Sequence, residues 1–126
     1  MNQTAQWTIA QRVQNGCRWL DENFPGWEER IDIHTLDLAN GHQCICGQVF
    51  AEEARDNKWS GHHGFDYAYS NFFQEANSWI PFDKQDPKRR VLVAHYLGFY
   101  SGSEKYAGLK REWKKVLRQR EVARNK

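Results

Sequence analysis

The C-terminal quarter of the chain constrains the fold most, because its apolar residues recur at the spacing of one helix face. The residues of this stripe are Tyr106, Leu109, Trp113, Val116 and Leu117. Steps of three and four residues place such side chains on one side of an α-helix. Ser101 and Glu104 have the spacing of a capping box, with Ser103 as the alternative cap. We therefore expect an amphipathic helix over residues 103–122 whose apolar stripe packs against other elements.

Two further segments show the same periodicity. Residues 4–24 carry apolar side chains at helical steps, and the Pro-Gly pair that follows ends the pattern. Asp86 and Pro87 form a helix-start signal and Gly98 a stop signal, so a helix is expected over residues 86–98. The three helices should form one core through Val13, Leu20, Leu92, Tyr96, Leu109, Trp113 and Leu117.

Residues 31–50 are harder to assign from periodicity. The apolar residues between 31 and 38 mix alternating and helical spacing, and Asn40-Gly41 is a turn signal. The apolar run at 44–51 fits a buried strand, or a buried helix that continues to about Arg55. We therefore predict a mainly α fold of about four helices around one core. A short β-hairpin near residues 31–50 is left open, with an α+β fold as the alternative.

The segment at residues 57–85 is expected to be irregular and rich in aromatic side chains. Long loops in small domains are often functional, and aromatic side chains on loops are typical anchors for a partner. The candidate partner-binding residues are Trp59, Tyr67, Tyr69 and Trp79. The alternative is that these rings fill the second half of the core. The length of 126 residues fits a single domain over residues 1–126.

Charge is distributed unevenly along the chain. Residues 110–126 hold eight Lys or Arg and two Glu, a net charge of +6, whereas residues 1–109 have a net charge of −4. Residues 21–56 alone carry nine acidic and two basic side chains, a net charge of −7. The candidate contacts to a nucleic acid or to an acidic partner are Lys110, Arg111, Lys114, Lys115 and Arg118.

Each charged segment also has a simpler interpretation. Lys and Arg are common on the solvated outer face of a packed helix, where they also complement the negative end of the helix dipole. The acidic segment could imitate nucleic-acid phosphates and occupy the basic channel of a host protein, or it could be an ordinary solvated face.

Thiol and imidazole groups offer a further candidate site. A zinc ion could be held by His42, Cys44, Cys46 and His62. Only one residue separates the two cysteines, however, which is closer than in common zinc sites, and the alternative is that they are small buried apolar residues. A thiol enzyme would instead pair Cys44 or Cys46 with His62 or His63, oriented by Asp66. No nucleophile turn supports it, so we assign no catalytic residue and expect no cofactor.

The cellular setting follows from what the sequence does not contain. It holds no run of about 18 apolar residues, and its N-terminus is polar. Three cysteines make a poor disulfide framework. We therefore expect a cytoplasmic protein without a membrane partner.

Short motifs are distributed along the chain. They are W-L-D-E at 19–22, P-G-W at 25–27, R-I-D at 30–32, L-D-L at 36–38, C-I-C-G-Q at 44–48, L-G-F at 97–99 and Y-A-G-L-K-R-E-W-K-K-V-L at 106–117. As a set they resemble an uncharacterised family of short bacteriophage and actinobacterial proteins. The likeness spans most of the chain except residues 57–85. It implies a phage setting, in which small proteins often bind and inhibit host machinery, and it implies no particular activity.

These observations lead to three functional hypotheses. The first is a non-enzymatic phage-type protein that contacts a host protein or nucleoprotein complex, for instance as an inhibitor of a defence system such as a CRISPR nuclease. The second is a small nucleic-acid-binding module that uses the basic C-terminal helix. The third is a zinc- or thiol-dependent enzyme, with the bacterial host cytoplasm as the location of all three.

Overall fold

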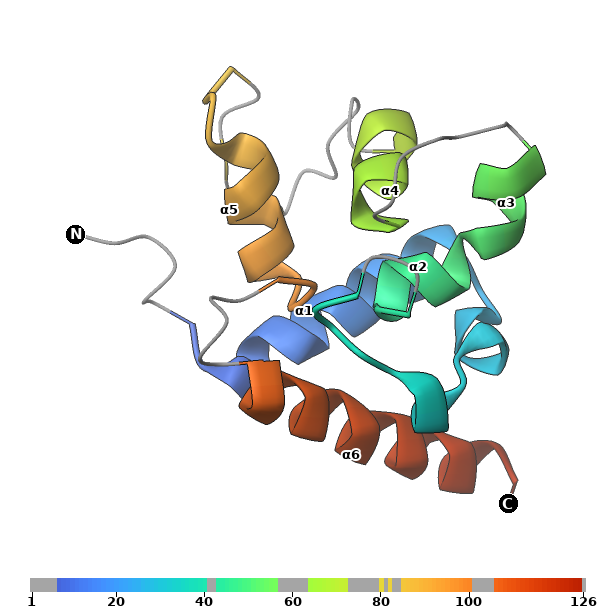
Figure 1. Cartoon of the computed structure of the whole chain (residues 1–126). Coiled ribbons are helices and arrows are strands. Elements are labelled where there is room, and N and C mark those ends of the chain that lie inside the picture. Colours follow the sequence, from blue (N-terminus) through green and yellow to red (C-terminus); the bar gives the residue numbers. More distant parts are fainter. Residues whose placement is uncertain are drawn as a thin grey trace.

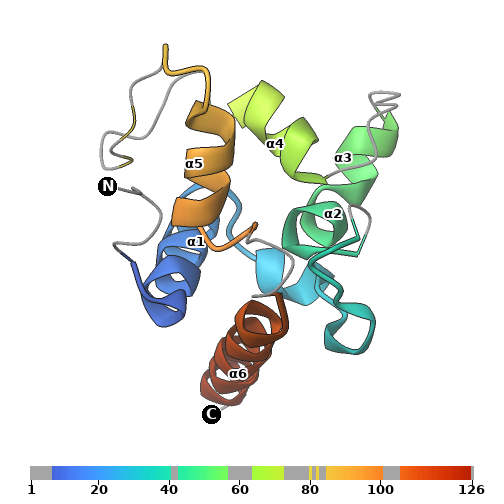
Figure 2. The same ribbon diagram turned by 60° about the vertical axis from the view of Figure 1, so that its left-hand side comes forward.

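The fold is mainly α, and the computed structural model has no strand among the residues it describes. The described residues are 7–40, 43–56, 64–72, 80, 82, 85–100 and 106–125. Their elements, in chain order, are α1 (Ile9–Asn23), the 3₁₀ helices η2 (Trp27–Arg30) and η3 (Ile33–Thr35), α2 (Ile45–Val49), α3 (Ala51–Asp56), α4 (Gly64–Phe72), α5 (Arg89–Tyr96) and α6 (Tyr106–Arg124). Figure 1 and Figure 2 both show α6 along one edge, with α3 and α4 on the far side of α2.

Helix α1 begins later than the periodicity predicts, at Ile9, because Thr8 caps it. The Thr8 hydroxyl accepts a hydrogen bond from the Gln11 backbone N–H at 3.1 Å, and the Gln11 side chain accepts one from the Thr8 N–H at 2.9 Å. This reciprocal capping box satisfies two backbone donors that would otherwise lack partners. The helix ends before Pro25 as expected, and Gly26, at φ +88°, turns the chain into η2.

Helices α1, α5 and α6 meet at two glycines. A Cβ on Gly16 would lie 2.1 Å from the Leu97 carbonyl oxygen and 2.9 Å from the Trp113 ring, so only glycine allows this approach. Gly98 adopts φ +71° and ends α5, which confirms it as the stop signal. Its carbonyl accepts a 2.7 Å hydrogen bond from the Trp113 indole N–H. The junction therefore fixes three helices at one buried point.

A buried arginine joins α1 to the end of α5, a contact the sequence did not suggest. Arg12 is only 4% exposed; its Nε donates to the His95 carbonyl at 2.6 Å, and its Nη2 donates to the Tyr100 carbonyl. Burial lowers the pKa of Arg12 from its ordinary value. A cation at this position complements the negative end of the α5 dipole, and Asn15 adds a 3.0 Å bond to the Tyr96 carbonyl.

Most of the predicted core residues are buried. Those that lie fully in the core are Val13, Leu20, Leu109, Trp113 and Leu117. The prediction was wrong for Leu92, which is only half-buried, and Tyr96 packs at the edge of the core. Helix α5 instead turns Val93 and Leu97 inward, because the glycine junction fixes its rotation about its axis.

The β-hairpin left open near residues 31–50 is not formed in the described part of that segment. Side chains, rather than a neighbouring strand, satisfy its backbone groups. Gln48 accepts from the Asp32 N–H at 2.6 Å and donates to the Gln43 carbonyl at 2.9 Å, and Asp32 caps η3 through the His34 N–H at 2.9 Å. The helical interpretation of residues 44–55 is the correct one, with a break at Phe50 between α2 and α3.

The expectation of an irregular segment at 57–85 was wrong for residues 64–72, which form α4. This helix packs on α2, as Figure 1 shows. Tyr67 and Ala68 turn into the core, and the Tyr67 ring centroid lies 6.1 Å from that of Phe50. Aromatic burial by a short helix, rather than a loop, extends the core in this region.

Candidate nucleic-acid interface on helix α6

The inner side of α6 is the core seam that the apolar stripe predicts. Leu109, Trp113, Val116 and Leu117 are buried, whereas Tyr106 at the start of the helix is only half-buried. The Trp113 ring stacks on Phe99, with centroids 6.0 Å apart, and meets Trp27 edge-on at 6.2 Å. This seam fixes the rotation of α6 and therefore decides which cations face outward.

The outer side carries four cations, which we call the basic face: Arg111, Lys114, Lys115 and Arg118. Arg111, Lys115 and Arg118 are exposed, and Lys114 is half-buried. At 1.5 Å of rise per residue the basic face is about 10 Å long. Lys110, the fifth predicted contact, is half-buried at its flank. Figure 1 shows the other described elements on one side of α6, and the burial of Leu109, Trp113 and Leu117 places the apolar stripe, not the basic face, on that side.

The charges of the basic face are little compensated within the described part of the chain. Lys115 lies 3.9 Å from Glu112, and its side chain is 62% exposed, so this pair stabilises the fold weakly. No described residue forms an ion pair with Arg111, Lys114 or Arg118. The structure thus places four of the five predicted contact residues on one face of α6, with Lys110 at its flank.

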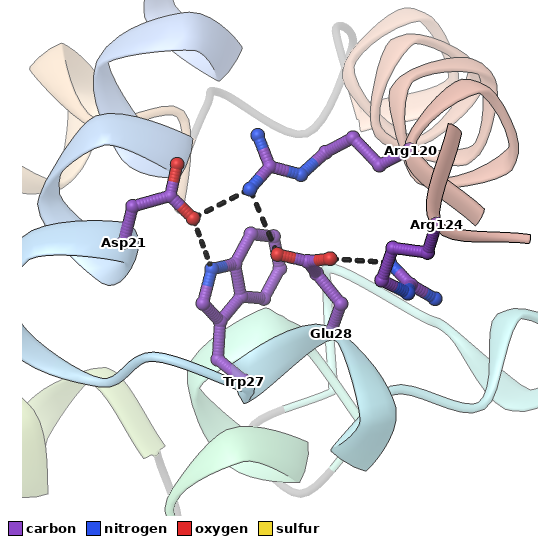
Figure 3. A network of polar contacts seen from close by, with 5 residues as sticks. All are labelled: Asp21, Trp27, Glu28, Arg120 and Arg124. Carbon is purple, nitrogen blue, oxygen red and sulfur yellow. Dashed lines mark hydrogen bonds and ion pairs between the residues drawn. The ribbon is translucent and has the colours of Figure 1, made fainter. Parts of the chain in front are cut away.

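Two other arginines of α6 point the opposite way, into the network of Figure 3. Arg120 Nη2 lies 2.5 Å from Asp21 Oδ1 and 2.8 Å from Glu28 Oε1, and Arg124 pairs with the second Glu28 oxygen. The Trp27 indole N–H donates to Asp21 at 3.0 Å, and the Arg120 guanidinium lies 5.5 Å from the Trp27 ring centroid. These contacts hold the C-terminal half of α6 against α1 and η2.

The surroundings of Arg120 keep it charged. Burial alone would lower its pKa, but the hydrogen bond to Glu28 and the nearby carboxylates raise the pKa overall. The Glu28 side chain is only 12% exposed. A partly buried cation with two carboxylate partners is a structural group, and it has little free charge to offer to an external ligand.

The acidic segment 21–56 does not form one uncompensated surface. Of its nine acids, four are in ion pairs: Asp21 and Glu28 with α6, Glu22 with Arg18 and Glu53 with Arg30. The Glu53 hydrogen bond, at 2.6 Å, raises the pKa of Arg30. The hypothesis of a phosphate-like acidic face therefore gains no geometric support.

The thiols are poorly placed for chemistry. Cys46 is fully buried, and burial raises its pKa well above the ordinary value, while burial raises the pKa of Cys17 to about 12. Cys44 caps α2 by accepting from the Gly47 N–H at 3.3 Å. Zinc binding and nucleophilic attack both need a thiolate, which burial disfavours at Cys46. The described residues contain no cluster of three metal-binding side chains; His42, His62 and His63 lie outside them.

The predicted aromatic anchors that the structure describes differ in their burial. Tyr67 is 4% exposed and belongs to the core, so its assignment as a partner contact was wrong. Tyr69 is half-buried, its hydroxyl accepts from Arg89 at 3.1 Å, and the Arg89 guanidinium lies 5.6 Å from its ring. Trp59 and Trp79 lie outside the described residues.

A cleft of about 460 Å³, which no sequence pattern predicts, lies beside α5. Its lining includes Phe65, Arg90, Val91, Ala94, Phe99 and Tyr100. Val91 and Tyr100 are 52% and 43% exposed, high values for large apolar side chains. The rotation of α5 that turns Val93 inward places Val91 at this open cleft.

Comparisons with known proteins find no match to a protein-family model, to a curated protein or to a solved structure. The resemblance to phage proteins therefore stays a prediction. None of the described helices is both long and apolar enough to cross a membrane.

Proposed function

We propose that the protein is a non-enzymatic binding protein that contacts the phosphates of a nucleic acid through the basic face of α6. The observation that carries this proposal is the separation of the α6 cations. Arg120 and Arg124 are paired with carboxylates, whereas the four cations of the basic face point outward with one weak partner among the described residues.

Phosphate contacts of this kind gain free energy by releasing condensed counterions. Each contact to duplex DNA contributes about −0.9 to the slope of log K against log salt. One contact therefore raises the affinity about eightfold at 0.1 M salt relative to 1 M salt. Four contacts give a slope of about −3.6 and a dissociation constant of roughly 10⁻⁴ to 10⁻⁶ M. The net charge of +2 is small, so the contact depends on orientation, with the basic face leading.

Fluorescence anisotropy with a labelled 20-bp duplex between 50 and 200 mM salt tests the proposal. Arg111→Gln with Arg118→Gln should weaken binding at least about tenfold at 100 mM salt and reduce the slope by about 2. A matched control, Arg55→Gln with Lys88→Gln, removes the same charge from two exposed residues elsewhere. Equal losses in both variants, or no binding by the parent protein at 50 mM salt, would contradict the proposal.

A second candidate function, contact with a host protein, is favoured by the cleft beside α5. Val91 and Tyr100 expose apolar surface at its edge, and such surface is typical of interaction sites. In this hypothesis the protein is a phage-type inhibitor of a bacterial defence complex, such as a CRISPR nuclease. It predicts that capture of a host protein from a nuclease-treated lysate is lost with Val91→Asp and kept with the Arg111→Gln/Arg118→Gln variant.

A further inference from the structure

We infer that the basic face of α6 binds double-stranded nucleic acid in preference to single strands. This inference rests on the proposed function and narrows its partner. It follows from which side chains α6 exposes, from the length of the basic face and from how firmly the core holds the helix.

No aromatic side chain is exposed on α6. Its exposed residues are Ala107, Arg111, Lys115, Arg118, Gln119, Glu121, Val122, Ala123 and Arg124. Trp113 lies in the core, and the half-buried Tyr106 ring packs edge-on against Tyr100 at 6.1 Å. Proteins that bind single strands without sequence preference gain much of their affinity by stacking bases on aromatic rings. The basic face lacks that source of affinity.

The length of the basic face favours the denser charge of a duplex. A duplex carries one phosphate per 1.7 Å of axis, so about six phosphates lie within the reach of a 10 Å face. One strand carries one phosphate per 3.4 Å, or about three over the same length. Four cations can therefore all find partners on a duplex, whereas a single strand offers fewer phosphates than there are cations.

The rigidity of α6 favours a regular partner. The helix is fixed along its inner side by Trp113 and Leu117 and near its end by the Arg120 and Arg124 ion pairs. The backbone positions of the outward cations are therefore set before binding, which suits the regular spacing of duplex phosphates. A flexible single strand would have to lose conformational freedom to match them.

The test compares a 20-bp DNA duplex with a 20-nucleotide single strand of the same sequence at 50 mM salt. Four contacts on the duplex release about 3.6 ions and three contacts on the single strand about 2.1, which predicts about ninetyfold tighter binding to the duplex at this salt concentration. Arg111→Gln with Arg118→Gln should weaken both complexes, and the Arg55→Gln/Lys88→Gln control should weaken neither to the same extent.

The outcomes separate this inference from the proposed function. Binding of the single strand as tightly as the duplex, through Arg111 and Arg118, would overturn the duplex preference and leave the nucleic-acid function standing. Binding of neither probe at 50 mM salt would overturn both. Quenching of tryptophan fluorescence by the single strand alone would indicate base stacking, and it would also contradict the inference.

Discussion

The inner and outer sides of α6 both carry arginine, but in different surroundings. Arg120 lies between two carboxylates and beside the Trp27 ring, whereas Arg118, two residues earlier, is exposed without an ion pair to any described residue. The residue type and the local sequence are nearly the same. What differs is the direction in which the core seam turns each side chain, so the packing of α6 decides which cations serve the fold and which remain for a partner.

Removing Trp113 should have the largest effect on the free energy of unfolding, because this ring packs the inner side of α6 into the core. Trp113→Ala should lower the free energy of unfolding by about 3–5 kcal/mol, through lost burial and a lost hydrogen bond to Gly98. Urea denaturation measures this change. Trp113→Phe keeps a ring and should cost less, about 1–3 kcal/mol. Equal losses in the two variants would show that ring burial is not what holds the seam.

Arg120→Gln should act on stability and spare nucleic-acid binding. It leaves Glu28, 12% exposed, with Arg124 as its one cation partner among the described residues, and should lower the free energy of unfolding by about 1–3 kcal/mol. Arg18→Gln is the matched control, since it breaks an exposed pair with Glu22 worth about 0.3–0.5 kcal/mol. If the folded Arg120 variant lost binding as strongly as the Arg111/Arg118 variant, the division between the two sides would be wrong.

Alkaline pH should lower the stability of the protein through Cys17, which α1 buries in the core. Burial raises the pKa of Cys17 from 9.0 to about 12. The unfolded chain therefore loses this proton first as pH rises, so stability present below pH 9 is lost between about pH 9 and 12. At pH 10 the loss from Cys17 should be about 1.4 kcal/mol relative to pH 8. Urea denaturation of the parent and of Cys17→Ala at both pH values isolates it; identical pH dependence in the two would refute it.

The smallest effect on stability is expected on the outer side. Arg111→Gln with Arg118→Gln should change the free energy of unfolding by no more than about 0.5 kcal/mol, because both side chains are exposed and glutamine is a good helix former. Thermal or urea denaturation measures this alongside the binding titration. A large destabilisation would mean that these arginines serve the fold, as Arg120 does.

Local signals in the sequence account for the parts of the fold that were predicted correctly. The stripe of α6, the proline after α1 and the glycine after α5 each act over a few residues. The choice between a β-hairpin and helices at residues 31–50 depends instead on Gln48. Its side chain bonds the backbone groups of Gln43 and Asp32, which are 5 and 16 residues away. Such side-chain contacts have no periodicity that a sequence pattern can reveal.

The sequence predicts only part of the candidate site, because long-range side-chain contacts complete it as well. The five basic residues could be listed from charge and helical spacing alone. Their separation from Arg120 and Arg124 could not, because Asp21 and Glu28 approach α6 from positions 99 and 92 residues earlier. Tyr67 is buried by α4, a helix that the sequence pattern does not predict, and aromatic content alone does not distinguish a core residue from a surface anchor.

The contacts of Arg12 also set the earliest time at which α1 and the end of α5 can join. The acceptors are 83 and 88 residues further along the chain, so these two hydrogen bonds cannot form until α5 and the following turn have been synthesised. At 5–20 residues per second the ribosome needs roughly 4–18 s to supply them. During that interval the Arg12 guanidinium lacks both of these acceptors, whereas Trp19 already has Phe24 and Phe50 to pack against.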